Sequence, residues 1–104
     1  MAKLYITEFV GPGVAHGGVV PVGNAGSWHE NASSPLNVTA TSTVSVTFGV
    51  NTSLVRLHTD STCSVFITAQ VTATATANNA RMIQNQTEYY AVSGGQAVAV
   101  IVNT

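Results

Sequence analysis

Residues 36–50, with the sequence LNVTATSTVSVTFGV, decide the fold class of this chain. Their even-numbered positions are apolar except for Ser42, and their odd-numbered positions are Asn, Thr, Ser or Gly. An alternation of period two places the apolar side chains on one face of an extended strand, and Val, Thr and Phe suit a half-buried pleated surface. Fifteen residues exceed the usual strand length, so we expect two strands with a break near 41–43.

Further strands are expected on both sides of this stretch. Runs of β-branched, aromatic and other apolar residues predict strands at 3–9, 19–22, 54–59, 63–69, 81–83, 87–92 and 96–102. The short polar or glycine-containing segments 60–62 and 93–95 predict hairpin turns between neighbouring strands. Residues 98–102 are apolar at every position, which predicts a strand covered on both faces.

The complete pattern predicts one all-β domain spanning residues 1–104. We expect a compact antiparallel β-sandwich or small barrel, and a jelly-roll-like topology is compatible with the strand number. Residues 11–35 contain six glycines and three prolines and predict a long loop, with Trp28 as its one large anchor. A loop of this length in a compact domain is usually functional or forms an interface. Residues 72–80, rich in Thr and Ala, predict a loop or polar strand that turns at 78–79.

Charge is scarce in this chain and narrows the possible partners. Only 7% of the residues are charged, as three cations and four anions. Such a chain has no basic patch for phosphates or for a membrane surface, so we expect no nucleic acid and no membrane as partner. Glu8 interrupts the N-terminal run before a signal peptide could form. A weakly charged surface favours association, either with other proteins or with further copies.

Catalytic and metal-binding patterns are weak. His16, His29 and His58 form no paired motif, although His58 and Asp60 have the spacing of residues on one strand face. Cys63 is the only cysteine, and its place on an apolar strand predicts core packing rather than a nucleophile activated by His58. We therefore expect no enzyme, no metal and no cofactor.

Aromatic residues are the best candidates for partner contacts. Tyr89 and Tyr90 are adjacent in an expected strand, so one ring is predicted to face the core and the other the solvent. Aromatic side chains are enriched at interface hot spots. The residues predicted to bind a partner are Tyr5, Trp28, His29 and Tyr90.

Four segments carry a resemblance to a known class of proteins. They are MAKLYITEF at 1–9, VRLHTDSTCSV at 55–65, ARMIQNQTEYYAV at 80–92 and AVAVIVNT at 97–104. Together they resemble small head-associated proteins of tailed bacteriophages, of the capsid decoration or cement type. The resemblance implies a structural virion protein on the capsid surface, made in the host cytoplasm, that binds the major capsid protein as a dimer or trimer. We expect its N-terminal strand and the glycine-rich loop to contact the capsid protein. The resemblance carries over no functional residue. Two alternatives stay open: another virion component, such as a tail or head-fibre part, and a small-barrel metal- or sugar-binding module.

Overall fold

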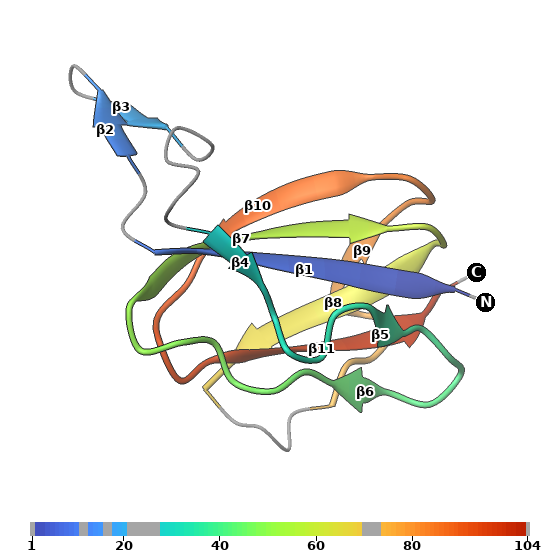
Figure 1. The fold of residues 1–104 in the computed structure, drawn as a ribbon. Coiled ribbons are helices and arrows are strands. Elements are labelled where there is room, and N and C mark those ends of the chain that lie inside the picture. Colours follow the sequence, from blue (N-terminus) through green and yellow to red (C-terminus); the bar gives the residue numbers. More distant parts are fainter. Residues whose placement is uncertain (1, 11–12, 16–17, 21–27, 70–73, 104) are drawn as a thin grey trace.

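The computed structural model describes residues 2–10, 13–15, 18–20, 28–69 and 74–103, and these form an all-β domain. Two antiparallel sheets pack face to face, and no helix occurs among the described residues (Figure 1). The predicted fold class, a small β-sandwich, is therefore confirmed.

The first sheet has the strand order β10-β7-β1-β4, and β5 also pairs with β1. Its strands are β10 (Thr87–Ala91), β7 (Thr52–Thr59), β1 (Lys3–Val10), β4 (Trp28–Glu30) and β5 (Leu36–Asn37). The second sheet has the order β6-β11-β8-β9, made of β6 (Thr43–Val44), β11 (Ala97–Val102), β8 (Cys63–Thr68) and β9 (Ala80–Met82). Two further strands, β2 (Gly13–Ala15) and β3 (Gly18–Val20), pair only with each other.

The core lies between the two sheets and follows the alternation of the long strands. β1 contributes Leu4 and Ile6, and β7 contributes Val55 and Leu57, all of them fully buried. The side chains that meet them from the second sheet and its connections are Cys63, Val65, Met82, Val98, Val100, Val38 and Phe48. Because alternate residues of a strand point to opposite faces, the residues of β1 and β7 that alternate with these inward ones form the outer face of the first sheet.

Strand β11 has the position that its apolar sequence predicts. It lies between β6 and β8, and its residues Ala97, Val98, Ala99 and Val100 are all fully buried. The outward residues Ala97 and Ala99 are thus covered as well as the inward ones. The prediction of a strand covered on both faces therefore holds for residues 97–100, whereas Ile101 and Val102 are half-buried.

Both predicted hairpins are wrong, because each connection crosses from one sheet to the other. Asp60, after β7, binds the beginning of β1: the Lys3 N–H donates to its Oδ1 at 2.6 Å. Thr62, before β8, instead accepts the Asn103 N–H at 3.1 Å, next to the end of β11. The second connection, 92–96, likewise joins β10 of the first sheet to β11 of the second.

Residues 36–50 also cross between the sheets, so their alternation does not keep one face. The Val38 N–H donates to the Ala2 carbonyl, beside the first sheet, whereas the Phe48 N–H donates to the Gln96 carbonyl, beside the second. Only β5 and β6 are regular strands, each two residues long. Val46 and Val50 are 48% and 88% exposed, contrary to the predicted apolar face.

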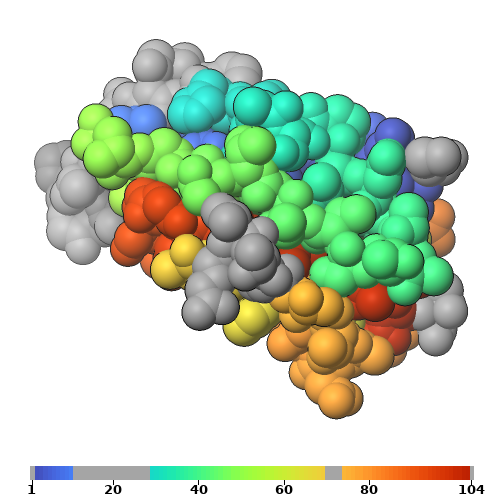
Figure 2. All heavy atoms as spheres, turned by 90° about the horizontal axis from the view of Figure 1, so that it is seen from below, coloured from blue at the N-terminus to red at the C-terminus, as the bar shows by residue number. Residues whose placement is uncertain are grey.

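Buried Ser45 explains why the alternation fails here: a polar residue at an odd position is buried. Its N–H donates to the Val98 carbonyl at 2.9 Å, and its hydroxyl accepts the Val98 N–H at 3.1 Å. A hydroxyl is required here to satisfy a buried backbone donor of β11. Figure 2 shows this segment running across one face of the molecule, with residues 74–80 against it, where the Ala75 N–H donates to the Ser42 hydroxyl at 2.8 Å.

The remaining expectations concern shorter segments. The glycine-rich segment 11–35, expected to be mostly loop, contributes the short strands β2, β3 and β4. The strand expected at 19–22 is β3, and its last two residues lie outside the described part of the chain. The turn expected at 78–79 is confirmed, because the Asn79 N–H donates to the Thr76 carbonyl at 3.0 Å, while residues 72 and 73 are not described.

Candidate interaction surface

The outer face of the first sheet combines aromatic rings with a single guanidinium group. We use "outer face" for the outward residues of its three long strands, which are Tyr5, Thr7 and Phe9 of β1, Leu54, Arg56 and His58 of β7, and Thr87, Tyr89 and Ala91 of β10. The strand register aligns them in three rows: Tyr5, His58 and Thr87; Thr7, Arg56 and Tyr89; Phe9, Leu54 and Ala91.

Two ring pairs lie on this face. The Tyr5 and His58 ring centroids are 6.3 Å apart, and those of Phe9 and Tyr89 are 6.5 Å apart, both with tilted planes. Tilted pairs at such distances are favourable arrangements of aromatic rings. Tyr5 and Tyr89 remain 39% and 42% exposed, whereas Phe9 is buried. Each pair thus holds one exposed tyrosine ring in place, ready for contact with another molecule.

Thr7 and Arg56, in the middle row, belong to a chain of polar contacts. Arg56 Nη2 donates to the Thr7 hydroxyl at 3.2 Å, and this hydroxyl in turn donates to Glu30 of β4. The second oxygen of Glu30 accepts the Ser34 hydroxyl at 2.9 Å. The guanidinium makes no ion pair with a described carboxylate within 4 Å. Arg56 therefore retains donors for a carboxylate or carbonyl of a partner.

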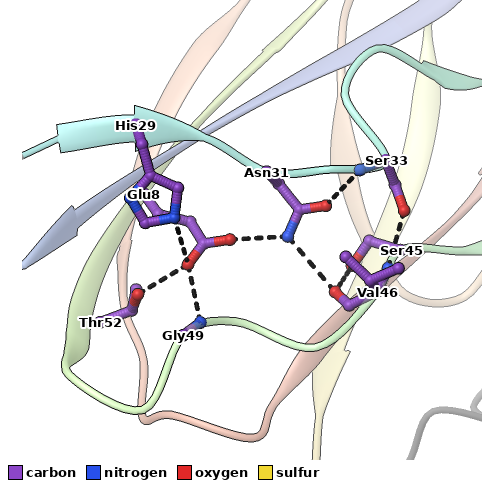
Figure 3. A network of polar contacts seen from close by, with 8 residues as sticks. All are labelled: Glu8, His29, Asn31, Ser33, Ser45, Val46, Gly49 and Thr52. Carbon is purple, nitrogen blue, oxygen red and sulfur yellow. Dashed lines mark hydrogen bonds and ion pairs between the residues drawn. The ribbon is translucent and has the colours of Figure 1, made fainter.

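A second cluster, centred on Glu8, lies at one end of the sandwich (Figure 3). Glu8 points inward from β1 and is only 2% exposed. Its carboxylate accepts the Asn31 side-chain N–H at 2.7 Å, the Gly49 backbone N–H at 2.9 Å and the Thr52 hydroxyl at 2.6 Å. His29 Nε2 lies 3.4 Å from the same carboxylate. This buried charge is thus compensated by three donors, which gives it a structural role as the anchor of segment 45–52.

Asn31 extends this cluster toward the irregular segment after β6. Its side-chain amide also donates to the Val46 carbonyl at 3.3 Å, and its oxygen accepts the Ser33 N–H at 2.8 Å. The Ser33 hydroxyl accepts the Val46 N–H at 2.8 Å. The backbone of Val46 is therefore bonded to side chains rather than to a neighbouring strand, which leaves the Val46 side chain exposed.

The residues predicted to bind a partner lie in three different environments. Tyr5 is on the outer face, and His29 is an exposed side chain beside Glu8. Tyr90 instead points inward and packs against the core. Trp28 pairs with Phe9 through the backbone of β4, and its side chain lies outside what the structure describes.

Sequence reasoning missed three members of the outer face: Arg56, His58 and Tyr89. The expectation that Tyr89 and Tyr90 face opposite sides is confirmed, but the exposed ring belongs to Tyr89. The pairing of β7 with both β1 and β10 brings these residues together, and strand order cannot be read from one sequence. The one available signal was the alternation of Tyr5, Thr7 and Phe9 in β1.

The side chains considered for catalysis or metal binding do not lie together among the described residues. Cys63 is buried in the core and contacts Thr59, whereas His58 lies on the outer face and bonds the Thr87 hydroxyl at 2.8 Å. Asp60 is engaged with the backbone of Lys3. No group of three potential metal ligands occurs in the described part of the chain, and His16 lies outside it. Within the same residues, no helix is long and apolar enough to cross a membrane.

Comparison of the chain with models of protein families, with curated proteins and with solved structures finds no match.

Proposed function

We propose that this chain is a structural protein of a phage head, a decoration protein that binds the major capsid protein through the outer face of its first sheet. The main observation in support of this proposal is the outer face, on which Tyr5 and Tyr89 are exposed on either side of Arg56. Buried tyrosine and arginine side chains supply much of the binding energy of protein interfaces. The resemblance of the four segments to phage head proteins is the reason for proposing the major capsid protein as the partner.

The low charge of the chain supports a contact made mainly by packing and hydrogen bonds. A decoration protein binds the assembled shell and not its separated subunits, so it stabilises the shell by mass action. Such binding requires a rigid surface, because ordering flexible side chains reduces the affinity. The ring contacts of Tyr5 with His58 and of Tyr89 with Phe9 provide this rigidity.

The structure limits how the N-terminal strand could contact the capsid. A capsid-binding arm would have to leave the sandwich, but β1 is an inner strand paired with β7 on one side and with β4 and β5 on the other. Its removal would expose the core residues Leu4 and Ile6. We therefore assign the contact to the outward side chains of β1 rather than to β1 as an arm.

Two measurements on particles of the encoding phage test this function. Mass spectrometry of purified virions is expected to find the chain in stoichiometric amounts, and electron cryomicroscopy is expected to place it on the head. Absence from virions would refute the proposal, and density confined to the tail would instead establish the alternative virion role.

A pair of variants tests the surface. Tyr5→Ser removes an exposed ring from the outer face, and Phe66→Ser removes a ring of equal exposure, 39%, from β8 in the other sheet. With particles that lack the native protein, Tyr5→Ser is expected to weaken binding at least about tenfold, the effect of losing a contact residue of moderate energy. Phe66→Ser is expected to bind normally. Equal binding by both variants would place the contact elsewhere.

A further inference from the structure

Among the edge strands of the described residues, β10 in the first sheet is the longest. β10 is five residues long and pairs only with β7. The other edges are formed by strands of two or three residues: β4 and β5 in the first sheet, and β6 and β9 in the second. Natural proteins avoid uncontrolled edge pairing by short edge strands, by Pro, by Lys and by inward-pointing charges. Of these features β10 has only the last, Glu88, whose carboxylate accepts the Gln86 side-chain N–H at 2.6 Å.

Two hydrogen bonds determine which backbone groups of β10 are free. The Thr59 N–H donates to the Gln86 carbonyl at 3.2 Å, and the Val92 N–H donates to the Ser53 carbonyl at 3.0 Å. In an antiparallel ladder, alternate residues bond the same neighbour. Glu88 and Tyr90 are therefore bonded to β7, and Thr87, Tyr89 and Ala91 direct their N–H and C=O groups to the side where the described chain has no strand.

We propose that a second copy of this chain pairs with β10 in antiparallel fashion, about a twofold axis through Tyr89. In this register Tyr89 is opposite the partner's Tyr89, and Thr87 is opposite the partner's Ala91. Every outward N–H and C=O group of the three residues then forms a hydrogen bond, and the two first sheets become one continuous sheet. A pairing of identical strands about a twofold axis is closed, so it produces a dimer and not a filament.

The side chains favour a second copy over an unrelated extended segment. On the outer face, the symmetric register places the two Tyr89 rings side by side, and aromatic cross-strand pairs stabilise antiparallel sheets. On the inner face, Glu88 is the one charged residue of β10. It would be opposite the partner's Tyr90 rather than the partner's Glu88, so no like charges meet directly. The side chains of β10 are thus compatible with a second copy of the strand on both faces of the sheet.

This inference does not depend on the proposed function, because its test uses the purified protein alone. Sedimentation velocity is expected to show a dimer that dissociates on dilution. Tyr89→Lys places two ammonium groups together at the axis and is expected to weaken dimerisation at least about tenfold. Tyr5→Lys is the matched control: it makes the same change of charge on the same face, at 39% instead of 42% exposure, away from β10. It is expected to leave the dimer intact.

A second pair of variants tests the backbone contact. Ala91→Pro removes an outward N–H and no bond to β7, so it is expected to weaken the dimer while the domain stays folded. Ala91→Val keeps that N–H and is expected to dimerise normally. Circular dichroism of each variant confirms the folded state.

Amide hydrogen exchange of the unmodified protein locates the interface without any substitution. At high protein concentration the amides of Thr87, Tyr89 and Ala91 are expected to be protected, and on dilution these three are expected to exchange faster while those of Glu88 and Tyr90 stay protected. A monomer at all concentrations, a trimer, a dimer with those three amides unprotected, or equal loss in Tyr89→Lys and Tyr5→Lys would each overturn the proposal. Protection that develops only with capsid protein would overturn it too, and would assign the edge to a strand of that partner.

Discussion

Glu8 shows how one buried carboxylate can organise an irregular segment. Its three donors come from Asn31, which follows β4, from Gly49, which lies before β7, and from Thr52, the first residue of β7. A buried charge is costly unless it is well compensated by hydrogen bonds. Charge-assisted hydrogen bonds of this kind are stronger than neutral ones, so the cluster fixes the path of residues 45–52 across the end of the core.

Replacing Glu8 by glutamine is expected to destabilise the protein although the side chain keeps its shape. The new amide N–H₂ would face either the Gly49 N–H, which cannot accept a hydrogen bond, or the Asn31 amide, which could reverse its role only by losing its bonds to Val46 and Ser33. An unmatched buried polar group costs about 1–3 kcal/mol. Urea denaturation measures this loss in the free energy of unfolding.

Glu30→Gln is the matched control for this substitution. Glu30 is exposed and accepts only the hydroxyls of Thr7 and Ser34, which can rotate and accept in turn. Its effect is expected to stay within about 0.5 kcal/mol, as for most surface substitutions. Equal losses in both variants would mean that the donors around Glu8 adapt freely.

At the level of single residues, apolar positions in the predicted long strands indicated burial better than alternation did. Leu4, Ile6, Val55, Leu57, Val98 and Val100 lie in strands predicted from their apolar residues and belong to the core, whereas Val46 and Val50 of the alternating segment are exposed. The role of Glu8 could not be predicted, because its donors lie 23, 41 and 44 positions away in the chain. Nothing in the local pattern distinguishes such a carboxylate from a solvated one.

Among the elements, the connection between β10 and β11 is closely restricted by a neighbouring segment. A Cβ atom added at Gly94 would lie 2.6 Å from the Val50 carbonyl oxygen and 2.7 Å from its Cα. Gly95 has a φ of 87°, which L-residues other than Asn and Asp rarely adopt, but a Cβ there would meet open space. Gly94 is thus required by the close approach of Val50, whereas Gly95 is favoured by its positive φ alone.

Gly94→Ala is expected to lower the free energy of unfolding by about 1–3 kcal/mol, because the clash is with backbone atoms of segment 49–50 that cannot rotate away. Gly95→Asn is the control, since Asn tolerates a positive φ and the site is open; its cost is expected to be well below 1 kcal/mol. Thermal and urea unfolding compare the two variants. A smaller effect at Gly94 than at Gly95 would contradict the close approach.

For the strands, the sequence predicted positions but not pairing. Positions of the long strands were predicted well, because β1, β7, β8 and β11 each have the expected composition and turn residues around them. The pairing of these strands within the sheets was not predicted. A short polar connection such as 60–62 can join strands within one sheet or between two sheets, and the choice depends on distant groups, here Lys3 and Asn103.

At the scale of the molecule, Cys63 and Tyr90 lie between the two sheets, and both have a raised pKa. Cys63 belongs to β8 in the second sheet, and Tyr90 belongs to β10 in the first. Burial raises the pKa of the Cys63 thiol above its ordinary value of 9.0, and the hydrogen bond with Thr59 opposes this in part. Burial also raises the pKa of Tyr90 above its ordinary value of 10.0, and the negative charges of Glu88 and Cys63 add to the effect.

The folded protein is therefore expected to lose stability in alkali. Since both pKa values are higher in the folded state, the unfolded chain releases these protons at a lower pH. Their contribution to stability is complete below about pH 9 and is lost as the pH rises through the folded values. Urea denaturation between pH 7 and 11 measures the decline. The double variant Cys63→Ala, Tyr90→Phe is expected to show a flatter profile above pH 9, whatever its stability at pH 7, because neither charge can then form between the sheets. An unchanged slope in this variant would show that other groups cause the alkaline loss.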